Sequence, residues 1–178
     1  MNGRELATLV LRNIGEDEDA VTYGEYADRI YAALNEAYQQ ACAFRYRPRK
    51  KVEILPQEES VISLDSLPED YYAPHSITDG QGYGVMFAWE PDGLRLGRKC
   101  DVVTLDYIYR PPVLDEDVTP VLPPVFHTAL ADYAAFRTMI PGGKQRQARA
   151  DLFYANYQRV MVQLTPMGDA CTFVNRYR

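Results

Sequence analysis

Histidine and cysteine, the residues most common in metal and redox sites, are scarce in this chain of 178 residues. The two histidines, His75 and His127, lie far apart, and no cysteine lies near either of them. The three cysteines (Cys42, Cys100 and Cys171) form no Cys-x-x-Cys pair, which predicts a reducing compartment and argues against a disulfide framework. The spacing of these residues fits no zinc site. We therefore expect no metal and no other cofactor.

Sequence motifs of catalysis are missing too. There is no Gly-x-Ser-x-Gly elbow, and the glycines of residues 80–84 precede a predicted strand, whereas dinucleotide-binding glycines must open a helix. Residues 142–145 (GGKQ) resemble the end of a phosphate-binding loop, but Gln145 replaces the Ser or Thr that would hold magnesium. We expect a protein that is not an enzyme. A small enzyme whose site is assembled from distant residues stays open as a further hypothesis.

Basic charge and long apolar runs are limited as well. The net charge of -6 and the pI near 5.0 disfavour a protein that grips DNA. No run is long enough to span a membrane, and residues 1–20 lack the features of a signal peptide, which predicts synthesis in the cytoplasm and no membrane partner. Residues 16–19 (EDED) and 115–117 are acidic. They are either solvated loops or surfaces that would repel DNA in a conduit.

Apolar residues at helical spacing predict four helices. The predicted helices span residues 3–14, 22–46, 124–140 and 144–164. Thr22 and Glu25 form the pattern of a capping box at the start of the second helix, and Pro123 and Pro124 open the third. The face predicted for the last helix consists of Ala148, Leu152, Ala155, Arg159 and Val162. Phe153, Tyr157 and Val160 widen this face.

In residues 52–110 the spacing of apolar residues changes from the helical period to the alternation typical of strands. This change predicts an inserted antiparallel sheet of three to five strands. Its predicted strands are residues 52–55, 61–64, 83–89, 94–96 and 102–110, and residues 91–93 form a turn. Residues 68–82 show no period and are predicted to be a loop that contains His75. The fold class is therefore α+β, a mainly helical bundle with a small antiparallel sheet inserted.

One cluster combines basic and aromatic residues. It consists of Arg45, Arg47, Arg49, Lys50 and Lys51, with Phe44 and Tyr46 among them. The cluster could contact DNA phosphates and stack on bases, or it could complement the helix dipole and the acidic loops of a neighbouring subunit. Both interpretations stay open.

The order of motifs around residues 101–137 resembles a known family. A strand ends in Tyr-x-x-x-Pro-Pro, an acidic connector follows, and Leu-Pro-Pro then opens a helix with the sequence ALADYAAFR. This pattern resembles the head-to-tail connector, or adaptor, proteins of tailed bacteriophages. The residues with close counterparts in that family are Tyr107, Pro111, Leu114, Leu122, Pro123, Tyr133 and Ala134. Residues 67–71 also match a corner of that family, and the resemblance covers most of the chain in element order.

The resemblance implies a single adaptor domain over residues 1–178, with a C-terminal tail at 165–178. It implies a structural virion protein in the neck, at the head–tail junction. There it would form a dodecameric ring between the portal protein and the tail or stopper proteins, through which DNA passes when the genome is ejected. It further implies that the end of the tail docks on the portal. Those residues are Thr172, Phe173, Val174, Asn175, Arg176, Tyr177 and Arg178.

Two points stay open beside this resemblance. Because chain ends are often mobile, a tail without a docking site remains the other interpretation of residues 172–178. The alternative function is a nucleic-acid-binding or DNA-packaging accessory protein, which the cluster at residues 45–51 would serve.

Overall fold

The computed structural model describes residues 1–56, 60–140 and 143–166. The chain divides into two compact units. The helical unit combines Met1–Tyr46 with the described part of Pro112–Arg178, and the sheet unit is Arg47–Pro111. The sheet unit is thus inserted between two halves of the helical unit. The predicted α+β class with an inserted antiparallel sheet is confirmed.

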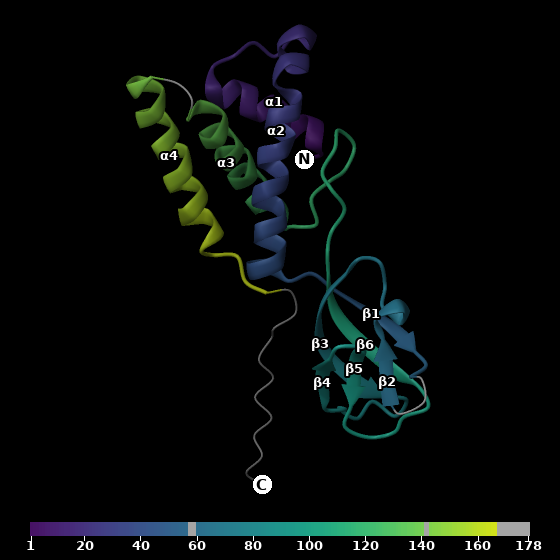
Figure 1. Ribbon diagram of the computed structural model, residues 1–178. Helices are drawn as coiled ribbons and strands as arrows, with labels where there is room; N and C mark the ends of the chain where they lie inside the picture. The colour runs from purple at the N-terminus through teal and green to yellow at the C-terminus, as the bar shows by residue number, and fades with distance from the viewer. Residues whose placement is uncertain (57–59, 141–142, 167–178) are drawn as a thin grey trace. The chain divides into compact units, whose positions relative to one another are not determined.

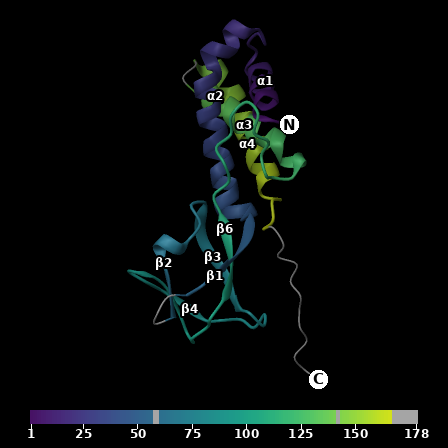
Figure 2. The same ribbon diagram turned by 90° about the vertical axis from the view of Figure 1, so that its right-hand side faces the viewer.

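The helical unit is built from α1 (Gly3–Ile14), α2 (Ala20–Ala41), α3 (His127–Met139) and α4 (Lys144–Met161). Figure 1 shows α3 between α2 and α4, while α1 packs against α2 and α3, and Figure 2 gives a second view of the four helices. Apolar side chains at helical spacing meet in one core. Its fully buried members include Leu6, Val10, Leu11, Ile30, Leu34, Tyr38 and Leu130.

The ends of α2 differ from the prediction. The predicted capping box at Thr22 is wrong, because Asp19 caps the helix and accepts hydrogen bonds from the backbone N–H groups of Val21 and Thr22. The Thr22 hydroxyl donates to the same carboxylate (2.8 Å). After Ala41 the backbone continues as a π-helical turn, η1 (Cys42–Tyr46), and Arg47 has a φ of 49°. The predicted 22–46 helix is therefore an α-helix followed by a wider turn.

The start of α3 follows from two prolines. Pro124 lies in the short 3-10 helix η4 (Pro124–Phe126), where a missing N–H costs little because it would lack a helical partner. His127 begins α3 and is buried, and its Nε2 bonds to the Leu122 carbonyl oxygen at 2.8 Å. Burial lowers the pKa of His127.

The face that α4 buries differs in part from the predicted one, although Phe153, Tyr157 and Val160, which were predicted to widen it, do pack against the helical core. Leu152 is 68% exposed and Val162 is 63% exposed, although both belong to the apolar face expected to pack. The opposite face is inside: Ala150 and Met161 are buried, and Tyr154 stacks on Phe136 of α3 with ring centroids 4.6 Å apart. The aromatic face is larger, so its burial removes more apolar surface from water.

The sheet unit contains β1 (Arg49–Ile54), β2 (Val61–Ser63), β3 (Tyr71–Asp79), β4 (Phe87–Glu90), β5 (Gly93–Leu96) and β6 (Val103–Tyr109). A short 3-10 helix, η3 (Leu64–Ser66), follows β2. In the described residues these strands form two antiparallel sheets, with the orders β1-β6-β3 and β2-β5-β4. The expectation of one sheet with three to five strands is therefore corrected to two sheets of three strands each.

The loop predicted for residues 68–82 is wrong over most of its length, because Tyr71–Asp79 is strand β3, and His75 lies in it. The pairing of β3 with β6 is irregular between Tyr71 and Ala73 and again between Pro74 and Ser76. Each irregularity breaks the two-residue period that marks a strand in a sequence.

The turn predicted at residues 91–93 is confirmed and joins β4 to β5. Gly93 has a φ of 152°, and a side chain there would overlap the carbonyl oxygen of Ile62 in β2. Glycine thus allows β2 and β5 to approach closely. The core of this unit includes Ile62, Leu94 and Leu105.

Candidate functional site

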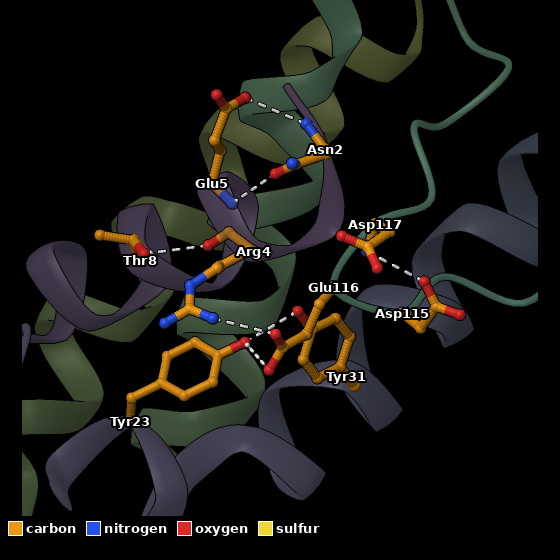
Figure 3. Close-up of polar contacts among 9 residues, drawn as sticks. All are labelled: Asn2, Arg4, Glu5, Thr8, Tyr23, Tyr31, Asp115, Glu116 and Asp117. Carbon is orange, nitrogen blue, oxygen red and sulfur yellow. Dashed lines mark hydrogen bonds and ion pairs between the residues drawn. The ribbon is translucent and has the colours of Figure 1, made fainter. Parts of the chain in front are cut away.

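The connector that follows the sheet unit, residues 112–123, packs along the first turn of α1, and Figure 3 shows part of this contact. The N–H of Gly3 donates to the Val118 carbonyl oxygen, and the N–H of Arg4 donates to the Glu116 carbonyl oxygen, both at 3.0 Å. A side chain at Gly3 would overlap the carbonyl oxygen of Asp115. Two N–H groups that a helix leaves without partners at its start are therefore satisfied by the connector.

Glu116 is the polar centre of this contact. Its carboxylate lies 3.0 Å from the Arg4 guanidinium, and the Tyr23 hydroxyl donates to it at 3.2 Å. The guanidinium also lies over the Tyr23 ring, 5.2 Å from its centroid. The hydroxyls of Tyr23 and Tyr31 are 3.0 Å apart, and burial raises the pKa of both.

Two local turns fix the groups around Glu116. Asn2 and Glu5 form a reciprocal capping box at the start of α1, with distances of 2.9 and 3.0 Å. On the connector, the Asp115 carboxylate accepts the N–H groups of Asp117 and Val118, both at 3.1 Å. This is the turn that Asp favours by bonding its own backbone two residues on.

Five of the seven acidic residues in these two segments are thus bound within the chain. Glu116 pairs with Arg4, Glu18 with Arg12 (2.8 Å) and Glu16 with Arg146 (3.1 Å). Asp115 and Asp19 each accept backbone N–H groups. Neither of the two sequence interpretations, solvated loops or a DNA-repelling surface, included these partners. The capping positions were detectable in the sequence, but the ion pairs join residues far apart and were not.

The basic cluster is divided by the structure. Arg45 belongs to the helical unit, and Arg47 onwards to the sheet unit. In β1, alternation places Arg49 and Lys51 on one face and Lys50 on the other. Arg45, Arg47 and Lys51 are exposed.

Lys50 contacts an acidic and an aromatic side chain within the sheet unit. Its ammonium lies 2.6 Å from the Asp70 carboxylate and 4.3 Å from the centre of the Tyr109 ring. The Tyr107 hydroxyl donates to the same carboxylate at 2.9 Å. Burial, with this hydrogen bond, raises the pKa of Tyr107 to about 12. From its place in β1, Lys50 thus contacts β6 and the residue that precedes β3.

The helical unit also carries an open groove of about 370 Å³. Its lining combines the end of α2, η1 and the end of α4, and includes Phe44, Arg45, Tyr154 and Tyr157. Phe44 is 69% exposed. The residues expected to dock on a portal, Thr172–Arg178, lie outside the described residues.

Exposed aromatic and apolar side chains also occur in the sheet unit. Tyr83, Met86 and Trp89 are 64%, 83% and 53% exposed. Trp89 keeps an edge-on contact with Tyr71, whose ring centroid lies 6.2 Å away. Trp, Tyr and Met are residue types that are enriched where proteins meet one another.

Titratable groups of the usual catalytic types are dispersed. His75 is exposed on β3, His127 is buried at the start of α3, and burial raises the pKa of the Cys42 thiol to about 12. Within residues 1–56, 60–140 and 143–166, no group of three or more His, Cys, Asp or Glu side chains could hold a metal ion. In the same residues, no helix is both long and apolar enough to cross a membrane.

Comparison of the sequence with models of known protein families and with curated proteins finds no match.

Proposed function

We propose that this protein is a structural subunit of a tailed-bacteriophage virion, a head-to-tail adaptor. In this proposal, copies form a ring between the portal and the tail in the virion neck, and DNA passes through the ring. The portal protein and the tail or stopper proteins are its partners, and the ring is dodecameric.

The observation that carries the proposal is the position of the residues that resemble the adaptor family. Leu114, Leu122, Tyr133 and Ala134 are buried in the core of the helical unit, and Tyr107 is buried in the sheet unit. The pattern thus occupies the connector and the helix beneath it. The resemblance therefore concerns core residues of both units and not a reactive site.

The exposed surface supports an assembly role as well. Phe44, Leu152 and Val162 in the helical unit and Met86 and Trp89 in the sheet unit are each more than half exposed. Single exposed apolar residues are normal, but large aromatic side chains in both units favour contacts with other chains.

The proposal is tested by mixing purified protein with the portal protein encoded in the same genome and imaging the mixture by negative stain. We expect rings seated on one end of the portal. A chain that neither binds the portal nor forms rings would contradict the proposal. A portal gene close upstream of this gene would be independent support.

A DNA-binding accessory role is the second candidate, favoured by the exposure of Arg45, Arg47 and Lys51. Phosphate binding by such residues weakens steeply as salt increases. This role predicts salt-sensitive binding to short DNA that Arg47→Glu with Lys51→Glu abolishes. Lys50→Glu is less informative, because it would also disrupt the pairing with Asp70.

A further inference from the structure

The outward face of α4 carries a row of mainly apolar residues with a basic residue near each end. The row, called the α4 row here, consists of Lys144, Ala148, Leu152, Ala155, Arg159 and Val162. All six residues are exposed, and they follow one another at spacings of three or four, so they share one side of the helix. Leu152 and Val162 are 68% and 63% exposed. Among the described residues, Val162 borders the open groove at the ends of α2 and α4, and Arg159 donates to Asn156 of its own helix and acts electrostatically on Asp132 of α3.

The outward face of α2 has the opposite charge. The row, called the α2 row here, consists of Val21, Glu25, Asp28 and Ala32. These residues are all exposed, and Val21 is 72% exposed. Spacings of four, three and four again place them on one side of the helix. Apolar residues thus flank two carboxylates.

The two rows lie on opposite sides of the helical unit. Each row is opposite the buried face of its own helix, formed by Ile30, Leu34 and Ala37 in α2 and by Ala150 and Met161 in α4. Figure 1 shows α3 between these two helices, and α3 contacts both of them. The rows therefore point away from each other, and one copy cannot join its own two rows.

The charges of the two helices complement each other. α4 carries four basic residues and one acidic residue, whereas α2 carries three acidic residues and one basic residue. Arg146 and Glu36 are paired inside the unit, with Glu16 (3.1 Å) and Arg137 (3.3 Å). Lys144 and Arg159 remain on one row, and Glu25 and Asp28 remain exposed on the other.

We infer that the α4 row of one copy docks on the α2 row of a second copy of this chain. Contact would bury Leu152 and Val162 and would bring basic and acidic side chains together. Because the two surfaces differ, the contact is head-to-tail, and repetition gives a ring if the rotation closes. The inference rests on the proposed ring and names the surfaces between its subunits.

The experiment compares two variants and one control of the full chain by light scattering over a concentration series. Leu152→Asp disrupts the α4 row, and Glu25→Lys with Asp28→Lys disrupts the α2 row. Val125→Asp is the control, because Val125 is 69% exposed in η4 and belongs to neither row. Unchanged thermal unfolding establishes that each variant is folded.

We expect wild-type and control proteins to form oligomers and each row variant alone to lose association by more than tenfold. An equimolar mixture of the two variants should form heterodimers but no larger oligomers, because the intact α4 row of one meets the intact α2 row of the other and the two remaining rows are disrupted. This result distinguishes a head-to-tail contact from a symmetric contact between two α4 rows.

Three results would overturn the inference. In the first, the α2-row variant alone assembles like wild type, which indicates pairing between α4 rows. In the second, both row variants keep wild-type association, which refutes the contact but leaves the proposed ring intact. In the third, wild-type protein stays monomeric at every concentration. The adaptor proposal is tested by a different measurement, binding to the portal, so its failure can be distinguished from failure of this inference.

Discussion

Asn35 and Leu114 bond reciprocally, with the Leu114 N–H donating to the Asn35 side-chain oxygen (2.7 Å) and the Asn35 amide nitrogen donating to the Leu114 carbonyl oxygen (2.9 Å). The side chain of Leu114 is buried in the helical core. One side chain of α2 thus satisfies both backbone groups of a connector residue.

Asn35→Ala should therefore destabilise the protein by roughly 2–3 kcal/mol, because it leaves two partly buried backbone groups without partners. Urea unfolding measures the change. Gln40→Ala, an exposed change on the same helix, is the matched control and should stay within about 0.5 kcal/mol of wild type. Equal unfolding midpoints for the two variants would refute the role of Asn35.

The close approach of α1 to the connector predicts different outcomes for two helical glycines. Gly3→Ala should destabilise by about 1–3 kcal/mol, because its methyl group would overlap the Asp115 carbonyl oxygen. Gly24→Ala should stabilise by roughly 0.5–1 kcal/mol, since nothing lies near that position in α2 and alanine favours helix. Thermal and urea unfolding of both variants would check this, and the same sign for both would contradict it.

Two neighbouring tyrosines of the sheet unit also predict different effects of the same substitution on stability. The Tyr71 hydroxyl is buried and has no hydrogen-bond partner among the described residues, whereas the Tyr107 hydroxyl donates to Asp70 at 2.9 Å. Tyr71→Phe should leave stability unchanged or raise it by up to about 1 kcal/mol, and Tyr107→Phe should lower it by about 1 kcal/mol. Chemical denaturation measures both. A larger loss of stability for Tyr71→Phe than for Tyr107→Phe would contradict this prediction.

Asp132 predicts a pH dependence of stability. Burial raises the pKa of this carboxyl from 3.8 to about 6, although the charge of Arg159 opposes the shift, and Asn13 donates to it at 3.4 Å. The folded chain thus binds the proton more tightly than the unfolded chain. The unfolding free energy therefore decreases as pH rises from about 4 to about 6, and the loss is complete above the folded pKa.

Asp132→Asn should remove this dependence and raise the unfolding free energy at about pH 8 by roughly 1–3 kcal/mol. The gain should shrink towards about pH 4, where the wild-type carboxyl is protonated. Asp151→Asn, at an exposed position of α4, is the control. A gain that does not vary with pH would exclude titration of Asp132 as the cause.

The thiols of Cys42 and Cys100 should react at different rates. Cys42 is 1% exposed and its pKa is raised to about 12, so it has little thiolate at neutral pH, whereas Cys100 is partly exposed. In a Cys171→Ser background, iodoacetamide followed by peptide mass mapping should label Cys100 at least tenfold faster. Equal rates under native conditions, with equal labelling after denaturation, would contradict the buried position of Cys42.

Local patterns in the sequence were sufficient for most helices and strands. Apolar spacing located α1, α3 and α4 to within a few residues, and the turn at Pro91–Gly93 located the hairpin of β4 and β5. These signals are reliable because helical and strand periods arise from backbone geometry that each residue shares with its close neighbours. The basic cluster was equally visible, but its partners were not.

Only the tertiary structure decided which residues far apart in the sequence contact each other. Both faces of α4 are apolar, and the aromatic face is buried because Phe136 and Tyr133 of α3 offer it ring contacts. Strand β3 is held by β6 despite two irregularities that hide its period. The partners of Glu116 come from α1 and α2, about a hundred residues away in the chain. Such pairings depend on which surfaces meet after folding, and no local spacing encodes them.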